Sequence, residues 1–272
     1  MPQIIVDKGL CTKCHTCSVV CVTKIIGNGE GSDFPAIPED KLDYCIKCGH
    51  CESFCPERAL TLDYLIEEKL VLTMDDASIE PDRLALYVKN RRSVRHFTTE
   101  SVSKEVVAQI IDIARYAASG GNSQPVKWIV IYEPVKITRI AALTIDWMRT
   151  IQSTNHPLAP YVSGIIAMWD SGVDLICHNA PHMVIAHIPE EQTDDPTDAI
   201  IAMTHFDIAA PSLGVGTCWA GFVKMAMDGY QPLRDFISLP DGRKAVCPML
   251  FGFSKFKVTS VPRRNPAEII WN

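Results

Sequence analysis

The spacing of apolar residues changes near residue 80. Before that point apolar residues come in short runs, and two of these runs, 2–7 and 59–62, flank a cysteine-rich stretch. Both runs are typical of short strands, and we expect them to pair. After Pro81 apolar residues recur at three- and four-residue intervals, which is the period of amphipathic helices. The sequence therefore predicts a small loop-rich module followed by a larger unit that contains helices.

The second part of the chain alternates predicted helices with predicted strands. Ser103 is a candidate N-cap, because the residues that follow it place apolar side chains on one helical face as far as Ala114. The predicted helices are 81–90, 104–114, 135–152 and a long, apolar, buried one over 197–213, and the predicted strands are 127–132, 183–188 and 246–253. A glycine-containing stretch that starts at Gly214 ends the long helix. This pattern predicts an α+β fold in which helices flank a small central mixed sheet.

Length and composition narrow the alternatives. A chain of 272 residues suits two domains, and we assign 1–65 to the first, 66–80 to a linker and 81–272 to the second. No apolar run approaches the roughly 18 residues that a membrane-spanning helix needs. The formal net charge of −6 argues against a nucleic-acid partner bound through its phosphates. We therefore expect a soluble protein whose partners include neither a membrane nor a nucleic acid.

Two cysteine runs carry the strongest chemical signal. Each run reads C-x2-C-x2-C-x3-C, and the last cysteine of the second run is followed by Pro56. This spacing is typical of ferredoxin modules with two [4Fe–4S] clusters, in which the fourth cysteine of each run ligates the other cluster. The predicted ligands of one cluster are Cys11, Cys14, Cys17 and Cys55, and those of the second are Cys45, Cys48, Cys51 and Cys21.

Zinc and disulfides are the alternatives for these cysteines. Structural zinc usually takes two cysteine knuckles and four ligands, so it does not need a third cysteine inside each knuckle. Disulfides suit short secreted chains, whereas this sequence starts Met1-Pro2-Gln3 without a charged and then apolar signal segment. The spacing favours two clusters, with zinc or another metal as the alternative. Because iron-bound thiolates need a reducing compartment, we expect a cytoplasmic location.

Several other residues receive structural interpretations. The glycine-rich stretch 27–32 is interpreted as a flexible turn, because a nucleotide-binding loop would follow a strand and open a helix. The histidines at 178, 182 and 187 lack the helical spacing of a zinc site, so His178, His182 and His187 are not assigned to a metal. His205 is predicted to lie in the core of the long apolar helix. The cysteines outside the two runs, Cys177, Cys218 and Cys247, are predicted to be buried.

Three separated segments resemble the FMN-binding segments of the nitroreductase family. They are the basic segment 91–97, the loop 120–125 and the stretch 214–221, and they occur in the family's order. Arg263 and Arg264 stand in the place of the family's C-terminal basic pair. Together with its cysteine module, the chain is similar to ferredoxin–nitroreductase fusion proteins.

The resemblance implies which residues hold FMN. Flavin phosphate is a compact dianion that needs several fixed donors. The implied phosphate ligands are Arg91, Ser93 and Arg95, with Arg263 and Arg264 closing the site from the other side, and Arg92 is a further predicted cofactor-binding residue. The residues implied at the flavin ring are Asn122, Gln124, Trp219, Ala220 and Gly221. The backbone of Ala220 and Gly221 would lie near flavin N5. The alternatives are a solvated charge run for Arg91 and Arg92, and a buried aromatic residue for Trp219.

The function that the resemblance implies is that of an FMN-dependent oxidoreductase. Its acceptors would be nitroaromatics, quinones or similar small oxidants, and its electrons would come from NAD(P)H or from a reduced carrier protein through the clusters. No side chain is assigned as catalytic, since the flavin supplies the chemistry. The resemblance also implies a homodimer with FMN at the interface. The alternatives are a non-catalytic electron carrier or redox sensor, and a related flavin reaction such as reductive dehalogenation.

Overall fold

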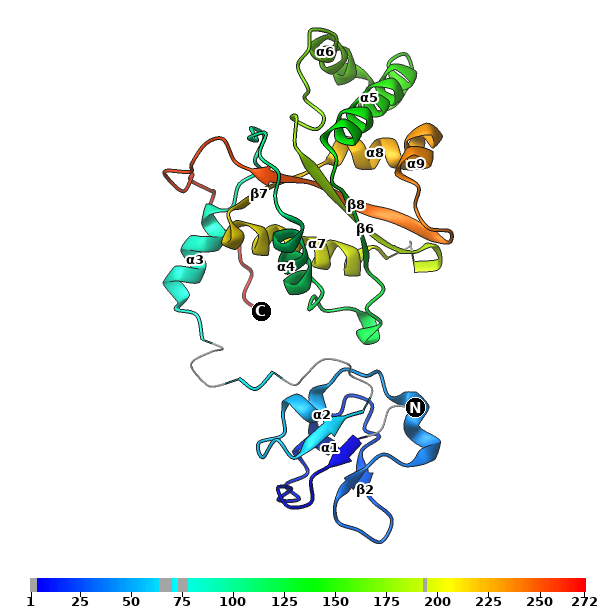
Figure 1. Cartoon of the computed structure of the whole chain (residues 1–272), viewed down its shortest axis with the longest axis vertical. Coiled ribbons are helices and arrows are strands. Elements are labelled where there is room, and N and C mark those ends of the chain that lie inside the picture. The colour runs from blue at the N-terminus through cyan, green and yellow to red at the C-terminus, as the bar shows by residue number, and fades with distance from the viewer. Residues whose placement is uncertain (1–3, 64–69, 73–77, 193–194) are drawn as a thin grey trace. The chain divides into compact units, whose positions relative to one another are not determined.

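The computed structural model describes residues 4–63, 70–72, 78–192 and 195–272 (Figure 1). The chain forms two compact units. The first consists of Met1–Ser78 together with Gly120–Ser123, and the second of Ile79–Ser119 together with Gln124–Asn272. Each unit has its own buried core and is described by itself. The predicted linker over 66–80 lies mostly outside the described residues.

The first unit is built on the pair of strands expected at its two ends. Strand β1 (Ile4–Val6) runs antiparallel to β4 (Leu60–Leu62), with Ile4 opposite Leu62. Between them lie α1 (Thr16–Val20), β2 (Gly27–Asn28), β3 (Pro35–Ala36), the 3-10 helix η1 (Glu39–Tyr44) and α2 (His50–Ser53). The prediction of a flexible turn over 27–32 was incomplete, because β2 pairs with β3 and makes this stretch part of a small hairpin.

The second unit contains a four-stranded sheet in the order β5-β6-β8-β7, and all its neighbouring strands are antiparallel. The strands are β5 (Lys127–Ile131), β6 (His182–Pro189), β7 (Val215–Trp219) and β8 (Arg243–Phe253). The α-helices are α3 (Pro81–Asn90), α4 (Lys104–Ala114), α5 (Pro134–Ile151), α6 (Ala159–Asp170), α7 (Thr197–Ala209), α8 (Gly221–Gly229) and α9 (Gln231–Ile237). Short 3-10 helices are η2 (Gly120–Asn122), η3 (Glu190–Gln192) and η4 (Ala210–Leu213). The α+β class predicted from the sequence is confirmed, but the prediction of a mixed sheet was wrong, because all three strand pairs of this sheet are antiparallel.

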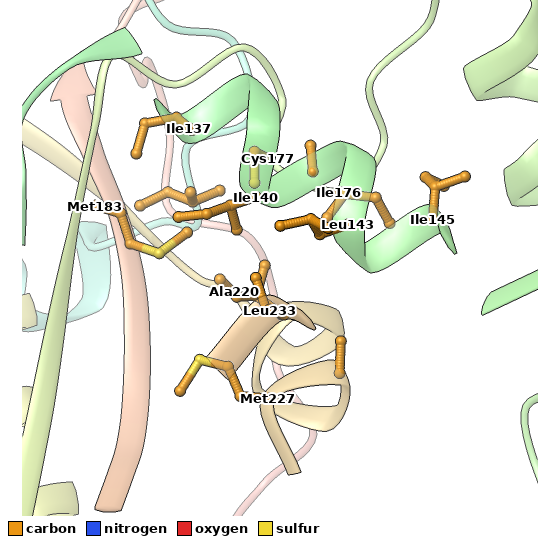
Figure 2. Close-up of a cluster of buried hydrophobic side chains, with 14 of the residues drawn as sticks. Ile137, Ile140, Leu143, Ile145, Ile176, Cys177, Met183, Ala220, Met227 and Leu233 are labelled. Atoms are coloured by element: carbon orange, nitrogen blue, oxygen red, sulfur yellow. The ribbon is translucent and has the colours of Figure 1, made fainter. Parts of the chain in front are cut away.

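Both faces of the central strand β6 are buried. Met183 and Ile185 belong to a cluster with α5, α6, α8 and α9, whereas Val184 and Ala186 belong to a cluster with α4 and α7. Figure 1 shows these two groups of helices on opposite faces of the sheet, and Figure 2 shows side chains of the first cluster gathered between α5 and α8. Alternation along a strand sends neighbouring side chains to opposite faces. A strand covered on both faces is therefore mostly apolar, and β6 carries only two polar residues, the buried His182 and His187.

Helix α4 shows how the local sequence sets an element's start. Ser103 has extended backbone, and its hydroxyl accepts a hydrogen bond from the Val106 amide at 3.3 Å, as the predicted N-cap requires. The apolar face of the helix then buries Val107, Ile110 and Ala114. Full burial of such a branched side chain contributes about 1.5–3 kcal/mol, so this face fixes α4 against the sheet.

The long apolar helix predicted over 197–213 differs from the structure in three respects. It is α-helical only to Ala209 and continues as η4, after which Gly214 ends it with a left-handed φ of 76°. The prediction that it is buried was partly wrong, because Ile200 and Ile208 are exposed on one side of α7. The prediction of a core position for His205 was also wrong: its ring is exposed and hydrogen-bonds the Ile201 carbonyl.

The residues after Gly214 form a strand that the sequence analysis did not anticipate. Val215–Trp219 make β7, an edge strand paired with the last part of β8. Helices α6, α8 and α9 were likewise not predicted. In the part of the chain that the structure describes, no helix is long and apolar enough to cross a membrane.

Candidate functional site

The cysteines of the first unit surround two separate cavities. One cavity is lined by Cys11, Cys14, Cys17 and Cys55, and the second by Cys21, Cys45, Cys48 and Cys51. These are the same crossed sets that the spacing predicted. Apolar side chains complete both cavities, among them Ile25 and Ile26 beside the second. Each set of four thiols around an enclosed, apolar cavity is able to hold one cubane cluster.

The two cysteine loops share a backbone pattern. The residues on either side of Cys14, and those on either side of Cys48, all have positive φ (57°, 57°, 54° and 77°). Only one of these four is a glycine, and for other residues the left-handed region is sparsely populated. The repeated conformation coils each loop tightly around its cavity. The chain therefore forms the same local structure twice, as expected from its repeated spacing.

The basic segment 91–97 is fastened to the edge of the second unit's sheet. Ser93 forms a parallel bridge with Thr217 of β7, and the Val94 amide donates to the Thr217 carbonyl at 2.8 Å. Further along, Phe97 bridges Ser254 just beyond β8. The backbone of the segment is thus attached to β7 at one point and to the residue after β8 at another.

A close approach between backbone and side chain holds this segment in place. A Cβ atom on Gly216 would lie 2.6 Å from Val94 Cγ2, and one on Gly252 would lie 3.0 Å from Phe97 Cδ1. Real Cβ atoms do not approach other carbon atoms to 2.6 Å, so the glycine at 216 is required by packing. Gly214 therefore allows the turn before β7, and Gly216 leaves room for Val94 of the basic segment.

Two arginines of the segment carry buried donors that are available to an anion. Within the described chain, Arg91 Nη1 and Arg92 Nη2 are buried without a hydrogen-bond partner. Arg91 Nη1 does lie 3.4 Å from Asp207 Oδ2, as an ion pair, and Arg92 Nη1 donates to the carbonyls of Lys89 and Arg91. Buried guanidinium donors are rarely left unpaired. A bound phosphate would accept hydrogen bonds from both of these nitrogen atoms.

Asp207 connects the basic segment to β7. It is a buried carboxylate on α7, and it accepts a hydrogen bond from the Thr217 hydroxyl and another, at 3.2 Å, from Trp219 Nε1. The Trp219 ring is 39 % exposed, so the interpretation of this residue as a buried aromatic was wrong. Its indole nitrogen is tethered, while its ring faces outward. Arg91, Thr217 and Trp219 thus converge on one carboxylate.

The turn from Trp219 to Gly221 offers one backbone amide. The Ala220 amide donates to the Pro248 carbonyl at 3.0 Å, whereas Gly221 is the first residue of α8, where helical amides have no intrahelical partner. Of the two amides implied near flavin N5, Gly221 is therefore the one at a free helix start. No described atom lies within 4 Å of where a Gly221 Cβ would stand, so packing in this chain does not explain the glycine.

A cavity of about 360 Å³ opens beside this turn. Trp219, Ala220 and Gly221 form one wall, and the start of β8 with Cys247 forms another. Lys224 and Lys244 place positive charge at its rim, and Lys224 also pairs with Asp228. Sites for small molecules usually measure roughly 300–1,000 Å³, so this cavity is large enough for a flat aromatic ligand.

The cysteines outside the two runs are buried, as predicted. Burial raises the pKa of Cys247 to about 11 and that of Cys177 well above its usual range. Burial also raises the pKa of the Cys218 thiol, and the nearby charge of Arg95 offsets part of this effect. All three thiols are therefore neutral near pH 7, and Cys218 lies within the field of the basic segment.

The predicted flavin-ring residues of the 120–125 loop fall in two places. Asn122 belongs to the first unit, where its Nδ2 donates to the carbonyls of Ile46 and Lys47 between two of the cysteines. Gln124 belongs to the second unit, and its amide donates to the Ser119 hydroxyl at 3.0 Å. Both residues have positive φ, so the loop is tightly bent on either side of Ser123.

The sheet places Gln124 and the basic segment at opposite edges. Gln124 precedes Lys127 of β5, which lies level with Ala245 near the start of β8. Ser93 attaches outside β7 and lies level with Phe251 near the end of β8. Four strand spacings and six residues of rise put Lys127 and Ser93 about 28 Å apart. A single flavin cannot contact both groups in one chain.

Arg263 and Arg264 lie in the C-terminal segment after β8. Residues 255–272 form no helix or strand, and both arginines are exposed. The structure thus brings the basic segment with Arg91, Arg92, Ser93 and Arg95 beside β7, which leads into Trp219, Ala220 and Gly221. Asn122, Gln124, Arg263 and Arg264 lie on other segments. Their roles toward FMN stay predictions.

Sequence reasoning missed three residues of this region, namely Asp207, Lys224 and Lys244. Asp207 had a signal, because it is an acidic residue between the apolar Phe206 and Ile208 of a helix that was predicted to be buried. The two lysines had none, since ordinary surface lysines have the same local sequence.

Comparison with known proteins identifies both parts of the chain. Residues 88–253 match the nitroreductase family, and residues 10–60 match a 4Fe-4S dicluster domain. A 4-nitrobenzoate reductase from Pseudomonas putida is 26% identical over 210 residues, which cover 67% of this chain and 90% of that protein.

Solved structures of similar fold include two with FMN bound. A nitroreductase from Bacteroides fragilis has a TM-score of 0.57 at 18% identity, and the match covers 70% of this chain and 98% of that one. A nitroreductase from Desulfitobacterium hafniense also has a TM-score of 0.57, at 22% identity, with 71% of this chain and 100% of that one covered. At these identities the likeness is one of fold.

Proposed function

The chain belongs to the nitroreductase family, and on that premise we propose that it is an FMN-dependent oxidoreductase with two [4Fe–4S] clusters in its first unit. Its acceptor is a small oxidant such as a nitroaromatic or a quinone. The expectation of a ferredoxin–nitroreductase fusion is confirmed by the two family matches. The cofactors, the electron donor and the acceptor are proposals that the next paragraphs support.

The donors of the basic segment that lack a hydrogen bond carry the proposal for FMN. Arg91 Nη1 and Arg92 Nη2 are buried without hydrogen bonds in the described chain, on a segment that is fixed to β7. A phosphate satisfies several such donors at once and is favoured by the charge of the guanidinium groups. We assign the phosphate to Arg91, Arg92, Ser93 and Arg95. Solvent alone would satisfy a surface charge run, but not buried donors.

The turn after β7 is assigned to the flavin ring. The Gly221 amide lies at the N-terminus of α8, where the helix dipole favours negative charge. An amide in that position stabilises electron density that develops on a bound ring. The open space beside Gly221 lets the ring approach the backbone closely, and the Trp219 ring stands at the same wall of the cavity.

The crossed cysteine sets are assigned to the clusters. Cys11, Cys14, Cys17 and Cys55 line one cavity, and the other four line the second, which agrees with the ligand pattern of two-cluster ferredoxins. When bound, the clusters supply one-electron transfer, and FMN supplies the storage of two electrons and their delivery as a pair. The residues of the chain bind these groups, orient them and exclude water from them.

A homodimer is part of the proposal, because the FMN residues divide between two edges of the sheet. Lys127, which follows Gln124 at the start of β5, and Ser93 of the basic segment stand about 28 Å apart in one chain. Two copies related by a twofold axis can place the 120–125 loop of one beside the basic segment of the other. The single interface of the dimer would then hold two equivalent FMN sites.

Cofactor content is the first test. Protein purified without oxygen should contain about eight irons, as much sulfide, and one FMN per chain. The Cys48→Ala variant should lose about half of the iron and keep its FMN, whereas Cys177→Ala, which changes a buried cysteine outside the runs, should keep both. Zinc in place of iron, or flavin loss that accompanies the loss of one cluster, would contradict the assignment.

The electron route and acceptor are tested with the same protein. NADH, NADPH and a chemically reduced ferredoxin are each added without oxygen, and the flavin absorbance is followed. Steady turnover of 4-nitrobenzoate is then measured, because Lys224 and Lys244 favour an acceptor that carries a carboxylate. Bleaching by ferredoxin alone would assign the clusters as the entry point. An electron carrier would show no saturable turnover with any acceptor.

A further inference from the structure

Asp207 has an unusual place in the second unit. It is a buried carboxylate on α7, in a helix whose other buried residues are Ala199, Ala202, Met203, Phe206 and Ala209. Removing a carboxylate from water costs several kcal/mol unless close partners compensate. The neighbouring side chains supply three partners, and each comes from a segment that the proposed FMN site uses. Groups of the proposed FMN site therefore compensate the free-energy cost of burying the Asp207 carboxylate.

The geometry divides the partners between the two carboxylate oxygens. Oδ1 accepts from the Thr217 hydroxyl in the middle of β7, next to the Ser93 bridge. Oδ2 accepts from Trp219 Nε1 at 3.2 Å and lies 3.4 Å from Arg91 Nη1. The same oxygen thus contacts the proposed phosphate clamp and the aromatic residue at the cavity wall.

We propose that Asp207 is a positioning residue for FMN, which holds the Arg91 guanidinium and the Trp219 indole in the orientations that receive the phosphate and the ring. This inference rests on the proposed function. Arg91 has a flexible side chain, and without an anchor it would lose rotamer entropy on binding an anion. Trp219 is 39 % exposed, and one hydrogen bond fixes its ring at the cavity. Asp207 therefore preorganises both groups before FMN arrives.

A purely structural role is the competing explanation, because the carboxylate also joins α7 to β7. The two roles differ in how their effects combine. A structural residue destabilises the fold regardless of which FMN ligands are present, so its effect adds to theirs. A positioning residue acts through Arg91 and Trp219, so its effect on FMN affinity shrinks when they are removed.

The test is a double-mutant cycle on apo-protein. The FMN dissociation constant is measured by flavin fluorescence for the wild type, Asp207→Asn, Arg91→Ala and the double variant. Asparagine keeps the size of the side chain and an acceptor for Thr217, but it loses the charge. Asp207→Asn should raise the constant about tenfold, which corresponds to 1.4 kcal/mol. In the Arg91→Ala background the same substitution should change it by less than about threefold.

A control and a second variant keep the inference refutable. Thr204→Val removes a hydroxyl that bonds the Ile200 carbonyl on the same helix, and it should leave FMN affinity unchanged. Trp219→Phe keeps an aromatic ring but removes the indole donor, and it should alter the visible circular dichroism of bound FMN. If Asp207→Asn does not fold, Trp219→Phe still tests the inference, because it removes the hydrogen bond between Trp219 and Asp207 at the exposed residue.

The outcomes separate the two proposals. Wild-type affinity in Asp207→Asn, or an equal tenfold loss with and without Arg91, would overturn the positioning role while FMN binding stands. Unchanged dichroism in Trp219→Phe would overturn the link through the indole. If the wild-type apo-protein does not bind FMN at all, the proposed function fails, and the role of Asp207 fails with it.

Discussion

His187 should make the second unit sensitive to acid. Its ring is buried in β6, and Arg243 Nε donates to His187 Nδ1 at 2.9 Å. Arg243 Nη2 also donates to the carbonyls of His187 and Pro125. A protonated Nδ1 would direct its hydrogen at the guanidinium, so the fold needs the neutral ring. Burial first, and then the charges of Arg243 and Lys127, lower the pKa of His187 to about 4.

The sign and the size of the effect follow from this shift. The unfolded chain takes up the proton near its ordinary pKa of about 6.5, whereas the folded chain does so only near 4. Between these values the unfolded state binds more protons, so stability falls as the pH falls. The stabilisation is complete above pH 6.5. About 2 kcal/mol is lost by pH 5 and about 3 kcal/mol by pH 4.

Urea unfolding of the full chain between pH 4 and 7.5 measures this loss. All five tryptophans follow residue 127, so tryptophan fluorescence reports on the second unit. His187→Asn keeps an acceptor near the Nδ1 position but does not titrate, and its profile should be flatter by the amounts above. His205→Asn, at an exposed ring, should follow the wild type. Parallel profiles for His187→Asn and the wild type would refute the reasoning.

Two substitutions test how the basic segment and α4 are held. Gly216→Ala should lower the unfolding free energy by about 1–3 kcal/mol and weaken FMN retention, because the new Cβ would meet Val94 at 2.6 Å. The control Gly164→Ala has no described atom near its Cβ and should not lower the unfolding free energy. Chemical denaturation and flavin content measure both, and normal values for Gly216→Ala would contradict the packing argument. Ser103→Ala should cost about 1 kcal/mol, because the Val106 amide loses its cap. An unchanged denaturation midpoint would show that this cap contributes nothing.

The elements that could be predicted from the sequence are those with a strong local signal. The cysteine spacing gave the two crossed sets that line the cavities, because cluster ligation depends on short, repeated intervals. Helix α3 begins at Pro81 and α4 follows the cap at Ser103, as their patterns indicated. Strand β6 was recognised because it is buried on both faces and hence has a continuous apolar run from Met183 to Ala186.

The elements that escaped prediction depend on distant partners. Strand β7 contains a glycine and a threonine and follows another glycine, so its sequence resembles a turn. Its pairing with β8 decides its structure. Trp219 is exposed, and its indole nitrogen bonds the carboxylate of Asp207, a contact that no local pattern reveals. The same holds for His205, which an apolar helix would be expected to bury and which faces outward.

The division of the predicted FMN residues has one further consequence. The segments that resemble an FMN site were identified separately, and their order along the chain contains no information about distance. The sheet order β5-β6-β8-β7 sets the segment before β5 and the segment beside β7 at opposite edges. If both contact flavin, they contact it from different copies of the chain. The assignment of Gln124 to the ring and of Arg91 to the phosphate therefore requires a homodimer. In a monomeric protein that retains FMN, either Gln124 or Arg91 would not contact the flavin.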